Sequence, residues 1–230
     1  MDFIAWKPVY ESILRDFGFS ERDDESTAIV LDSLLQQKHS VYSLDSVCAL
    51  LKHKRVIVCG AGPSLESSLI AHRTLLGEAV CITADGATSA LLKQGVTPDI
   101  IVTDLDGNVC DQVHANAKGS LVIIHAHGDN RSSLEQYVPQ FTGPLAGTTQ
   151  TNPGPYDTLH NFGGFTDGDR AVFLADHCNA QKISLMGFDF TGAIGTYSFS
   201  SKKDAKQKLQ KLQWCERLIN SLQNPTIHYL

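Results

Sequence analysis

The apolar residues of this chain recur with a helical period at first and gather into short continuous runs further on. Within residues 1–54 they recur three or four positions apart, which predicts helices that each bury one face. Phe3, Trp6, Ile13 and Phe17 mark the first helix, and the second is expected over residues 24–37. Core packing explains this spacing better than a cofactor-binding helix does, so this segment is expected to carry little chemistry.

From residue 56 the pattern is typical of buried parallel strands. Five short apolar runs cover residues 56–59, 79–82, 100–102, 121–124 and 183–186. Helical stretches over 64–76 and 87–94 separate some of them, and residues 201–222 form an amphipathic helical pattern. Strands that alternate with helices predict an α/β fold: a mostly parallel open sheet, Rossmann-like, with helices on both faces.

This pattern divides the chain into three parts. We expect a helical N-terminal segment over residues 1–54, an α/β catalytic domain over 55–200, and a C-terminal helix within 201–230 packed on that domain. No internal repeat or low-complexity tract interrupts them.

The composition of the chain limits the classes of partner and the cellular location that we expect for it. The chain has 230 residues, of which 42% are hydrophobic and 19% charged, which suits a globular core. A net charge of −6 argues against broad nucleic-acid binding. The chain has neither a membrane-length apolar run nor the basic start of a secretory signal, so a cytoplasmic location without a membrane partner is expected. Six scattered cysteines without a CxxC pair indicate free thiols in a reducing cytosol.

A glycine-rich turn follows the first predicted strand. Its sequence is Gly60-Ala61-Gly62-Pro63-Ser64, and glycines let backbone N–H groups approach an anion closely. Ser64 could donate to a phosphate or cap the next helix. The turn lacks the third glycine of the dinucleotide fingerprint and the lysine of a Walker A loop, so a structural turn is the alternative.

Carboxylates follow the next two strands. Asp85 could coordinate a metal, bond a ribose hydroxyl or cap a helix. Asp104 and Asp106 stand two positions apart after a buried strand, where both can reach one hard cation such as Mg²⁺. A solvated acidic turn is the alternative for this pair.

Two histidines end the fourth predicted strand. His125 and His127 would share one face if the strand continues, and they are expected to donate to phosphate or substrate. Asp129 could act as a base or metal ligand, and Asn130 completes the motif. Histidines that merely cap the sheet are the alternative.

The last polar group surrounds a predicted helix start. Thr166 or Asp167 can begin that helix, and Arg170 offers a forked donor for phosphate. Asp189 follows the last predicted strand and joins the same edge. In open α/β sheets ligands bind at the carboxyl ends of the strands, where all these residues are expected.

Taken together, these motifs resemble the archaeal 6-hydroxymethyl-7,8-dihydropterin pyrophosphokinase family. The resemblance spans residues 56–190 and is carried by the turn at 60–65, Asp-Gly-Ala at 85–87, the acidic run at 98–107, His-Ala-His-Gly-Asp-Asn at 125–130, the segment 164–171 and Gly-Phe-Asp at 187–189. The acidic elements also look like those of thiamine pyrophosphokinases. Those enzymes usually have Ser after the second Asp, where this chain has Gly107, so thiamine activity is less expected.

The resemblance implies an enzyme that uses ATP as co-substrate, needs one or two Mg²⁺ ions and acts on a hydroxymethyl pterin. It implies the transfer of a pyrophosphoryl group, with AMP as the second product. The metal ligands expected are Asp85, Asp104, Asp106 and Asp167. Asp104, Asp106, Asp129 and Asp167 are expected to be catalytic.

The ligand-binding residues expected alongside them are Gly60, Gly62, Ser64, Asp85, His125, His127, Asn130, Thr166, Arg170 and Asp189. The partners expected are small molecules, and the sequence leaves open whether the chain forms a homo-oligomer. A sugar-nucleotide glycosyltransferase and a non-catalytic nucleotide sensor are the alternatives, because Asp-x-Asp also binds a metal and a diphosphate in glycosyltransferases.

Overall fold

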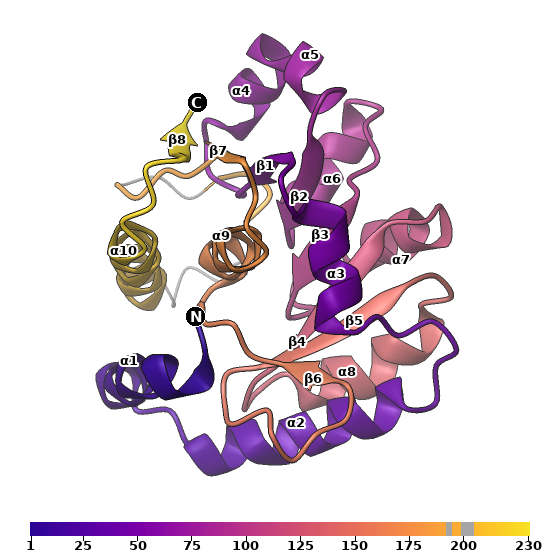
Figure 1. Cartoon of the computed structure of the whole chain (residues 1–230), viewed down its shortest axis with the longest axis vertical. Helices are drawn as coiled ribbons and strands as arrows, with labels where there is room; N and C mark the ends of the chain where they lie inside the picture. The colour runs from indigo at the N-terminus through magenta and orange to yellow at the C-terminus, as the bar shows by residue number, and fades with distance from the viewer. Residues whose placement is uncertain (192–194, 199–204) are drawn as a thin grey trace.

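The fold is built on one open sheet whose strands are all parallel (Figure 1). The computed structural model describes residues 1–191, 195–198 and 205–230. The described strands are β1 (Arg55–Cys59), β2 (Val80–Ala84), β3 (Ile100–Thr103), β4 (Leu121–Ala126), β5 (Leu145–Thr149), β6 (Leu159–His160), β7 (Lys182–Met186) and β8 (Ile227–Tyr229). They are ordered β6-β5-β4-β3-β2-β1-β7-β8 across the sheet.

All five predicted strands are confirmed, as β1, β2, β3, β4 and β7, and so is the α/β class with a parallel open sheet. The sheet is wider than the sequence indicated, because β5, β6 and β8 were not predicted. β5 and β6 extend it beyond β4, and β8 pairs with β7 at the opposite edge.

Helices connect and cover the strands. The described ones are α1 (Phe3–Phe17), α2 (Glu21–Leu35), α3 (Leu44–Leu51), α4 (Leu65–Ala71), α5 (Arg73–Leu76), α6 (Ala87–Lys93), α7 (Val109–Ala117), α8 (Arg131–Tyr137), a 3₁₀ turn (Val138–Gln140), α9 (Asp167–His177) and α10 (Ala205–Ser221). None of them, in the part of the chain that the structure describes, combines the length and apolar character needed to cross a membrane.

Several helix boundaries differ from the predicted ones. α2 begins at Glu21 because the Ser20 side chain accepts a hydrogen bond from the backbone N–H of Asp23. The helix expected over 64–76 is divided at His72 into α4 and α5. The predicted start of the C-terminal helix, residues 201–204, lies outside the described residues; the described helix α10 packs on α9 (Figure 1).

Alternate residues of each strand bury themselves in separate cores on the two faces of the sheet. Val56 and Val58 of β1 pack in a core with α1, α3, α9 and α10. Ile57 and Cys59 face the other way, toward α4 and α6. Farther along that second face, α2, α7 and α8 cover β3, β4 and β5. The predicted helices on both faces are therefore confirmed, and they leave the carboxyl ends of the central strands to form a site.

A disulfide corrects the expectation of free cysteines. Cys48 of α3 is bonded to Cys178, which follows α9, across 130 positions of sequence. Both residues pack in the core that contains α1 and α9, so the fold brings them together although their spacing gives no sign of it. Cys59, Cys81, Cys110 and Cys215 are free, as expected.

Candidate active site

A cavity of about 630 Å³ opens along the carboxyl ends of the parallel strands. Its lining comes from the ends of β1, β2, β3, β4, β5 and β7, from the start of α9, from one face of α10, from the connection between α1 and α2 with the start of α2, and from residues 195–198. This volume lies within the range of cavities that enclose small-molecule ligands. Twelve residues expected from the sequence line it: Gly60, Gly62, Asp85, Asp104, Asp106, His125, His127, Asp129, Thr166, Asp167, Arg170 and Asp189.

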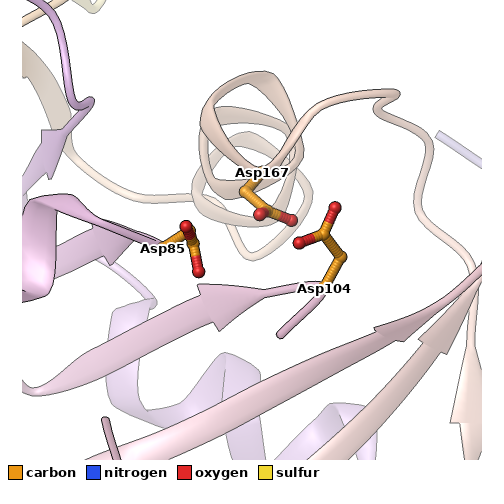
Figure 2. Close-up of side chains that lie close together, drawn as sticks. All are labelled: Asp85, Asp104 and Asp167. Carbon is orange, nitrogen blue, oxygen red and sulfur yellow. The ribbon is translucent and has the colours of Figure 1, made fainter. Parts of the chain in front are cut away.

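Three carboxylates meet in this cavity (Figure 2). Asp85 follows β2, Asp104 follows β3, and Asp167 is the first residue of α9. One oxygen from each lies within 4.8 Å of the others, and all three residues are partly buried. We call this group the acidic cluster.

Asp85 is fixed in place by its neighbours. Its Oδ1 accepts hydrogen bonds from Thr103 Oγ1 at 3.0 Å and Gln112 Nε2 at 2.7 Å. Gly107 leaves room for it, because a Cβ at that position would collide with the Asp85 carboxylate. Gly107, where thiamine pyrophosphokinases usually have Ser, is thus in direct contact with the acidic cluster.

The cluster concentrates negative charge. Burial and the charge of Asp104 raise the pKa of Asp85, and the same two causes raise the pKa of Asp167 well above its ordinary value. Burial opposes ionisation of Asp104 as well, but hydrogen bonding and the charge of His127 lower its pKa to about 2. Closely spaced oxygen ligands that repel one another fit a hard cation, and Mg²⁺ prefers such a donor set. The residues present therefore fit the expected metal.

Asp106 is the expected metal ligand that does not belong to the acidic cluster. It lines the cavity but is exposed. Partial burial of its carboxylate and the charges of Asp104 and Asp85 raise the pKa of Asp106 to about 8. Its carboxylate is therefore close enough to Asp85 and Asp104 for their charges to act on it.

His127 links the cluster to Asp129. Its Nε2 lies 3.3 Å from Asp104 Oδ2, and its Nδ1 lies 2.5 Å from Asp129 Oδ1. Burial would lower the pKa of His127, but hydrogen bonds and the charges of these two carboxylates raise it to about 10. His127 lowers the pKa of Asp129 in return, so this exposed carboxylate is better suited to hold His127 than to accept a proton.

Asn130 holds the loop that carries His127. Its Nδ2 donates to the carbonyls of Asp104 and His125, each at 2.8 Å, and its Oδ1 accepts from the His127 backbone at 3.1 Å. Asn130 does not line the cavity. Its side-chain contacts are structural, which differs from the ligand contact expected from the sequence.

The glycine turn packs closely against the residues that follow β7, and this packing uses its backbone donors. The N–H of Gly60 donates to the Met186 carbonyl at 2.8 Å, and that of Gly62 donates to the Gly187 carbonyl at 2.9 Å. Ser64 donates through both its backbone N–H and its hydroxyl to Asp189 Oδ2. These N–H and hydroxyl groups, which were expected to bind an anion, therefore form hydrogen bonds that join the end of β1 to the end of β7 and the residues after it. Ser64 makes no side-chain cap on α4.

Arg170 is also engaged within the protein. Its side chain donates to Asp167 Oδ1 at 2.9 Å and to the Phe165 carbonyl at 2.9 Å, and the residue is 2% exposed. Thr166 caps α9 in a reciprocal capping box with Asp169. Arg170 thus orients Asp167 and offsets part of the cluster's charge.

Two lysines that the sequence motifs did not indicate also line the cavity. Lys208 and Lys211 lie on the face of α10 that borders the cavity. The charge of Lys211 helps to lower the pKa of Asp104, which places this lysine within electrostatic reach of the cluster. A three-residue spacing of lysines on one helical face was visible in the sequence, but nothing there indicated where that face would lie.

The fold and the site define an α/β protein with a carboxylate cluster suited to a divalent cation, at the edge where such folds bind ligands. A family model described as "6-hydroxymethylpterin diphosphokinase MptE-like" matches residues 32–194. The chain belongs to this family.

Full-length relatives agree with this assignment. The chain is 44% identical over 229 residues to the 6-hydroxymethyl-7,8-dihydropterin pyrophosphokinase of Methanothermobacter thermautotrophicus, with 97% of this chain and 96% of the relative covered. It is 41% identical to the protein of the same name from Pyrococcus furiosus, over 97% and 95% of the two chains. The protein of that name from Methanocaldococcus jannaschii is 36% identical, with 97% of each chain covered.

A solved structure is similar in fold. The MAf glycosyltransferase of Magnetospirillum magneticum aligns with a TM-score of 0.54 at 18% identity, over 80% of this chain and 30% of its own. At this identity the likeness concerns the fold alone.

Proposed function

We propose that this chain transfers the diphosphoryl group of ATP to the hydroxymethyl group of 6-hydroxymethyl-7,8-dihydropterin, giving AMP and the pterin diphosphate. The observation that carries the proposal is the acidic cluster, which lies in a ligand-sized cavity of a chain related over its full length to enzymes named for this activity. In such a transfer the hydroxyl attacks the β-phosphorus of ATP and AMP departs. Positioning and charge neutralisation supply most of the catalysis.

Asp85, Asp104 and Asp167 would hold Mg²⁺, and Asp106 lies beside them for a second ion. The cation would neutralise the charge of the triphosphate. The protein's own contribution is to fix these oxygens: Asp85 is held by Thr103 and Gln112, and Asp167 by Arg170.

Lys208 and Lys211 would balance the negative charge brought by ATP. Both border the cavity from α10. Because a triphosphate carries more charge than one divalent ion neutralises, lysines facing a carboxylate cluster provide a suitable opposite wall. The cavity would then hold the phosphate chain between the cluster and α10.

Product analysis tests the reaction class. The protein is incubated with Mg²⁺, ATP and 6-hydroxymethyl-7,8-dihydropterin, and nucleotide and pterin products are quantified by mass spectrometry. We expect AMP and pterin diphosphate in equal amounts. ADP with a pterin monophosphate would instead indicate phosphoryl transfer, and turnover only with a nucleotide sugar would indicate a glycosyltransferase.

A pair of matched variants ties the reaction to the cluster. Asp104→Asn is expected to reduce kcat at least about 100-fold, because it removes a ligand oxygen and its charge. Asp45→Asn makes the same chemical change at an exposed position of α3 outside the cavity and should leave kcat unchanged. Equal activity of both variants would contradict the assigned site.

A further inference from the structure

Asp24 is a buried carboxylate at the wall of the cavity that does not belong to the acidic cluster. It lies in the first turn of α2 and is 2% exposed. Its segment was expected from the sequence to carry little chemistry. A carboxylate is seldom buried in a protein unless other groups bind it, so the contacts of Asp24 indicate its role.

Three donors from separate parts of the chain bind the Asp24 carboxylate. Tyr10 of α1 donates its hydroxyl to Oδ2 at 2.6 Å, and Gln150, which follows β5, donates its amide to Oδ2 at 2.8 Å. The backbone N–H of Gly128 donates to Oδ1 at 2.7 Å. Burial raises the pKa of Asp24, and these three hydrogen bonds oppose that rise. Asp24 therefore joins α1, α2, the end of β5 and the loop after β4.

The bond to Gly128 bears on the acidic cluster, because Gly128 follows His127 in the chain. His127 Nε2 lies 3.3 Å from Asp104 Oδ2, so this contact depends on the backbone that carries the ring. Asn130 holds that backbone at His127, since its Oδ1 accepts from the His127 N–H at 3.1 Å. Asp24 holds it at the next residue. The loop is thus fixed by its own Asn130 and by α2.

The loop approaches α2 closely at this point. Gly128 has no Cβ, and one built there would lie 3.0 Å from the Cβ of Asp23 and 3.4 Å from Asp24 Oδ1. The following side chain, that of Asp129, is 87% exposed. Helix α2 therefore contacts the loop where it leaves the protein interior for solvent.

We propose that Asp24 is a positioning residue of the acidic cluster: its bond to the Gly128 N–H fixes the loop that carries His127, and His127 holds Asp104 in place. The inference rests on the proposed function, because it assigns Asp24 to the site where that reaction would occur. Asp24 needs no contact with either substrate for this role. The helical segment before β1 thereby contributes to the site as well as to the core.

Two alanine variants of α2 separate positioning from stability. Asp24→Ala removes the acceptor of the Gly128 N–H. Asp32→Ala is the matched control, because Asp32 is 9% exposed and lies on the same helix outside the cavity. Asp32 Oδ1 accepts from Thr158 through the backbone N–H at 2.9 Å and the hydroxyl at 2.7 Å. Each change leaves protein donors without their acceptor, so both should lower the melting temperature.

Only Asp24→Ala should disturb the site. Mn²⁺ serves as the probe of the cluster, and its binding is followed by electron paramagnetic resonance of the free ion. We expect Asp24→Ala to weaken Mn²⁺ binding about 10-fold and to lower kcat about 10- to 100-fold, as loss of a residue that orients a metal-binding group does. Asp32→Ala should leave both unchanged. Equal effects of the two variants would make Asp24 a purely structural residue and overturn the proposal.

Asp24→Asn tests whether geometry or charge is responsible. The Asn oxygen can still accept from the Gly128 N–H, while its amide can donate to the Tyr10 hydroxyl and to the oxygen of a turned Gln150 amide. We therefore expect Asp24→Asn to recover most of both losses, to within about threefold of the original chain. An Asn variant as impaired as the Ala variant would show that the charge of Asp24 acts on the cluster, which would refute the role given to the bond.

Gly128→Val tests the same contact without removing the carboxylate. The branched side chain meets Asp23, so the loop must move away from α2, while the bonds from Tyr10 and Gln150 to Asp24 are kept. Mn²⁺ binding and kcat should fall as in Asp24→Ala. This variant decides the outcome if Asp24→Ala does not fold, and unchanged values would show that the loop does not depend on α2.

Mn²⁺ binding keeps this inference separate from the proposed reaction. If the variants change Mn²⁺ binding as expected but the original chain makes no pterin diphosphate, the proposed function fails and the positioning role stands. If the original chain makes both products but Asp24→Ala behaves like Asp32→Ala, the positioning role fails alone.

Discussion

Asp85 is held in a conformation and an electrostatic environment that cost the fold stability. The residue has φ of 40°, a left-handed backbone conformation that L-residues seldom adopt, and its carboxylate is held against the charge of Asp104. Thr103 and Gln112 bind that carboxylate from the protein side. The surroundings therefore hold in place a group that would be more stable in water, which is typical of a functional position.

Asp85→Asn should make the protein more stable and less active. The amide can keep the bonds from Thr103 and Gln112 through its oxygen while removing one of the repelling charges. In the presence of a chelator, we expect the free energy of unfolding at pH 7 to rise by about 1–2 kcal/mol. Chemical denaturation measures this change, and product formation in Mg²⁺ should fall at least about 100-fold. A less stable variant would argue against repulsion within the cluster.

Gly107→Ala should disturb the same carboxylate from the other side. The added methyl group would meet both oxygens of Asp85, so the aspartate must move. We expect kcat to fall roughly 10- to 100-fold while the circular dichroism spectrum is retained. Gly77→Ala is the matched control, because the nearest atom to its new Cβ would be 3.6 Å away. Similar activity of both variants would show that Gly107 has no such role.

At the scale of elements, the sequence predicts the continuously apolar strands well and the short or more polar strands poorly. β1, β3 and β4 are buried on both faces and are therefore continuous apolar runs. β5 contains Gly147 and two threonines, β6 has two residues, and β8 contains His228, so none of these has a clear strand pattern. Pairing with a neighbouring strand, which depends on the whole fold, makes them strands.

The site, too, could be predicted from the sequence only in part. The acidic residues could be predicted because parallel strands bring their carboxyl ends to one edge, wherever the chain runs between them. The contribution of α10 depends on how this helix packs on α9, which no local pattern encodes. The engagement of Ser64 with Asp189 also joins residues 125 positions apart, beyond the reach of motif reasoning.

His160, on the edge strand β6, should make the free energy of unfolding depend on pH. Burial lowers the pKa of His160, on β6, below its ordinary value, and its Nε2 has no partner among the described residues. Because the pKa is lower in the folded state, the neutral ring favours folding above about pH 6.5, and this stability is lost as the pH falls below that value. We expect the free energy of unfolding to decrease from pH 7 to pH 5, and to decrease less in His160→Gln. Parallel curves for the two proteins, measured by urea denaturation, would exclude His160 as a source.

At the scale of the whole molecule, α9 connects the site to the core. Its first residue is Asp167 of the acidic cluster, and the residue after its last turn, Cys178, is bonded to Cys48 of α3. α9 also contacts β1, β2, β3 and β7 as well as α10. The position of one carboxylate of the acidic cluster is thereby tied to the packing of the central sheet.

Breaking this disulfide should destabilise the chain. The bond closes a loop of 130 residues, and such links contribute about 2–4 kcal/mol, chiefly by restricting the unfolded state. The double variant Cys48→Ser, Cys178→Ser should lower the urea midpoint, and a reducing agent should lower the midpoint of the original chain but not of the variant. An unchanged midpoint under reduction would show that the bond contributes nothing to stability.

The strand order also determines when the site is completed during synthesis. β1 pairs with β2, its near neighbour in the chain, but its other edge pairs with β7, whose residues are translated more than one hundred positions later. Until the ribosome has released residues 182–186, the nascent chain has an open, apolar strand edge at a position that lies inside the finished sheet. The glycine turn after β1 must wait equally long for Asp189, and the acidic cluster is not complete until Asp167 and α9 are made, so every part of the pocket depends on segments translated late.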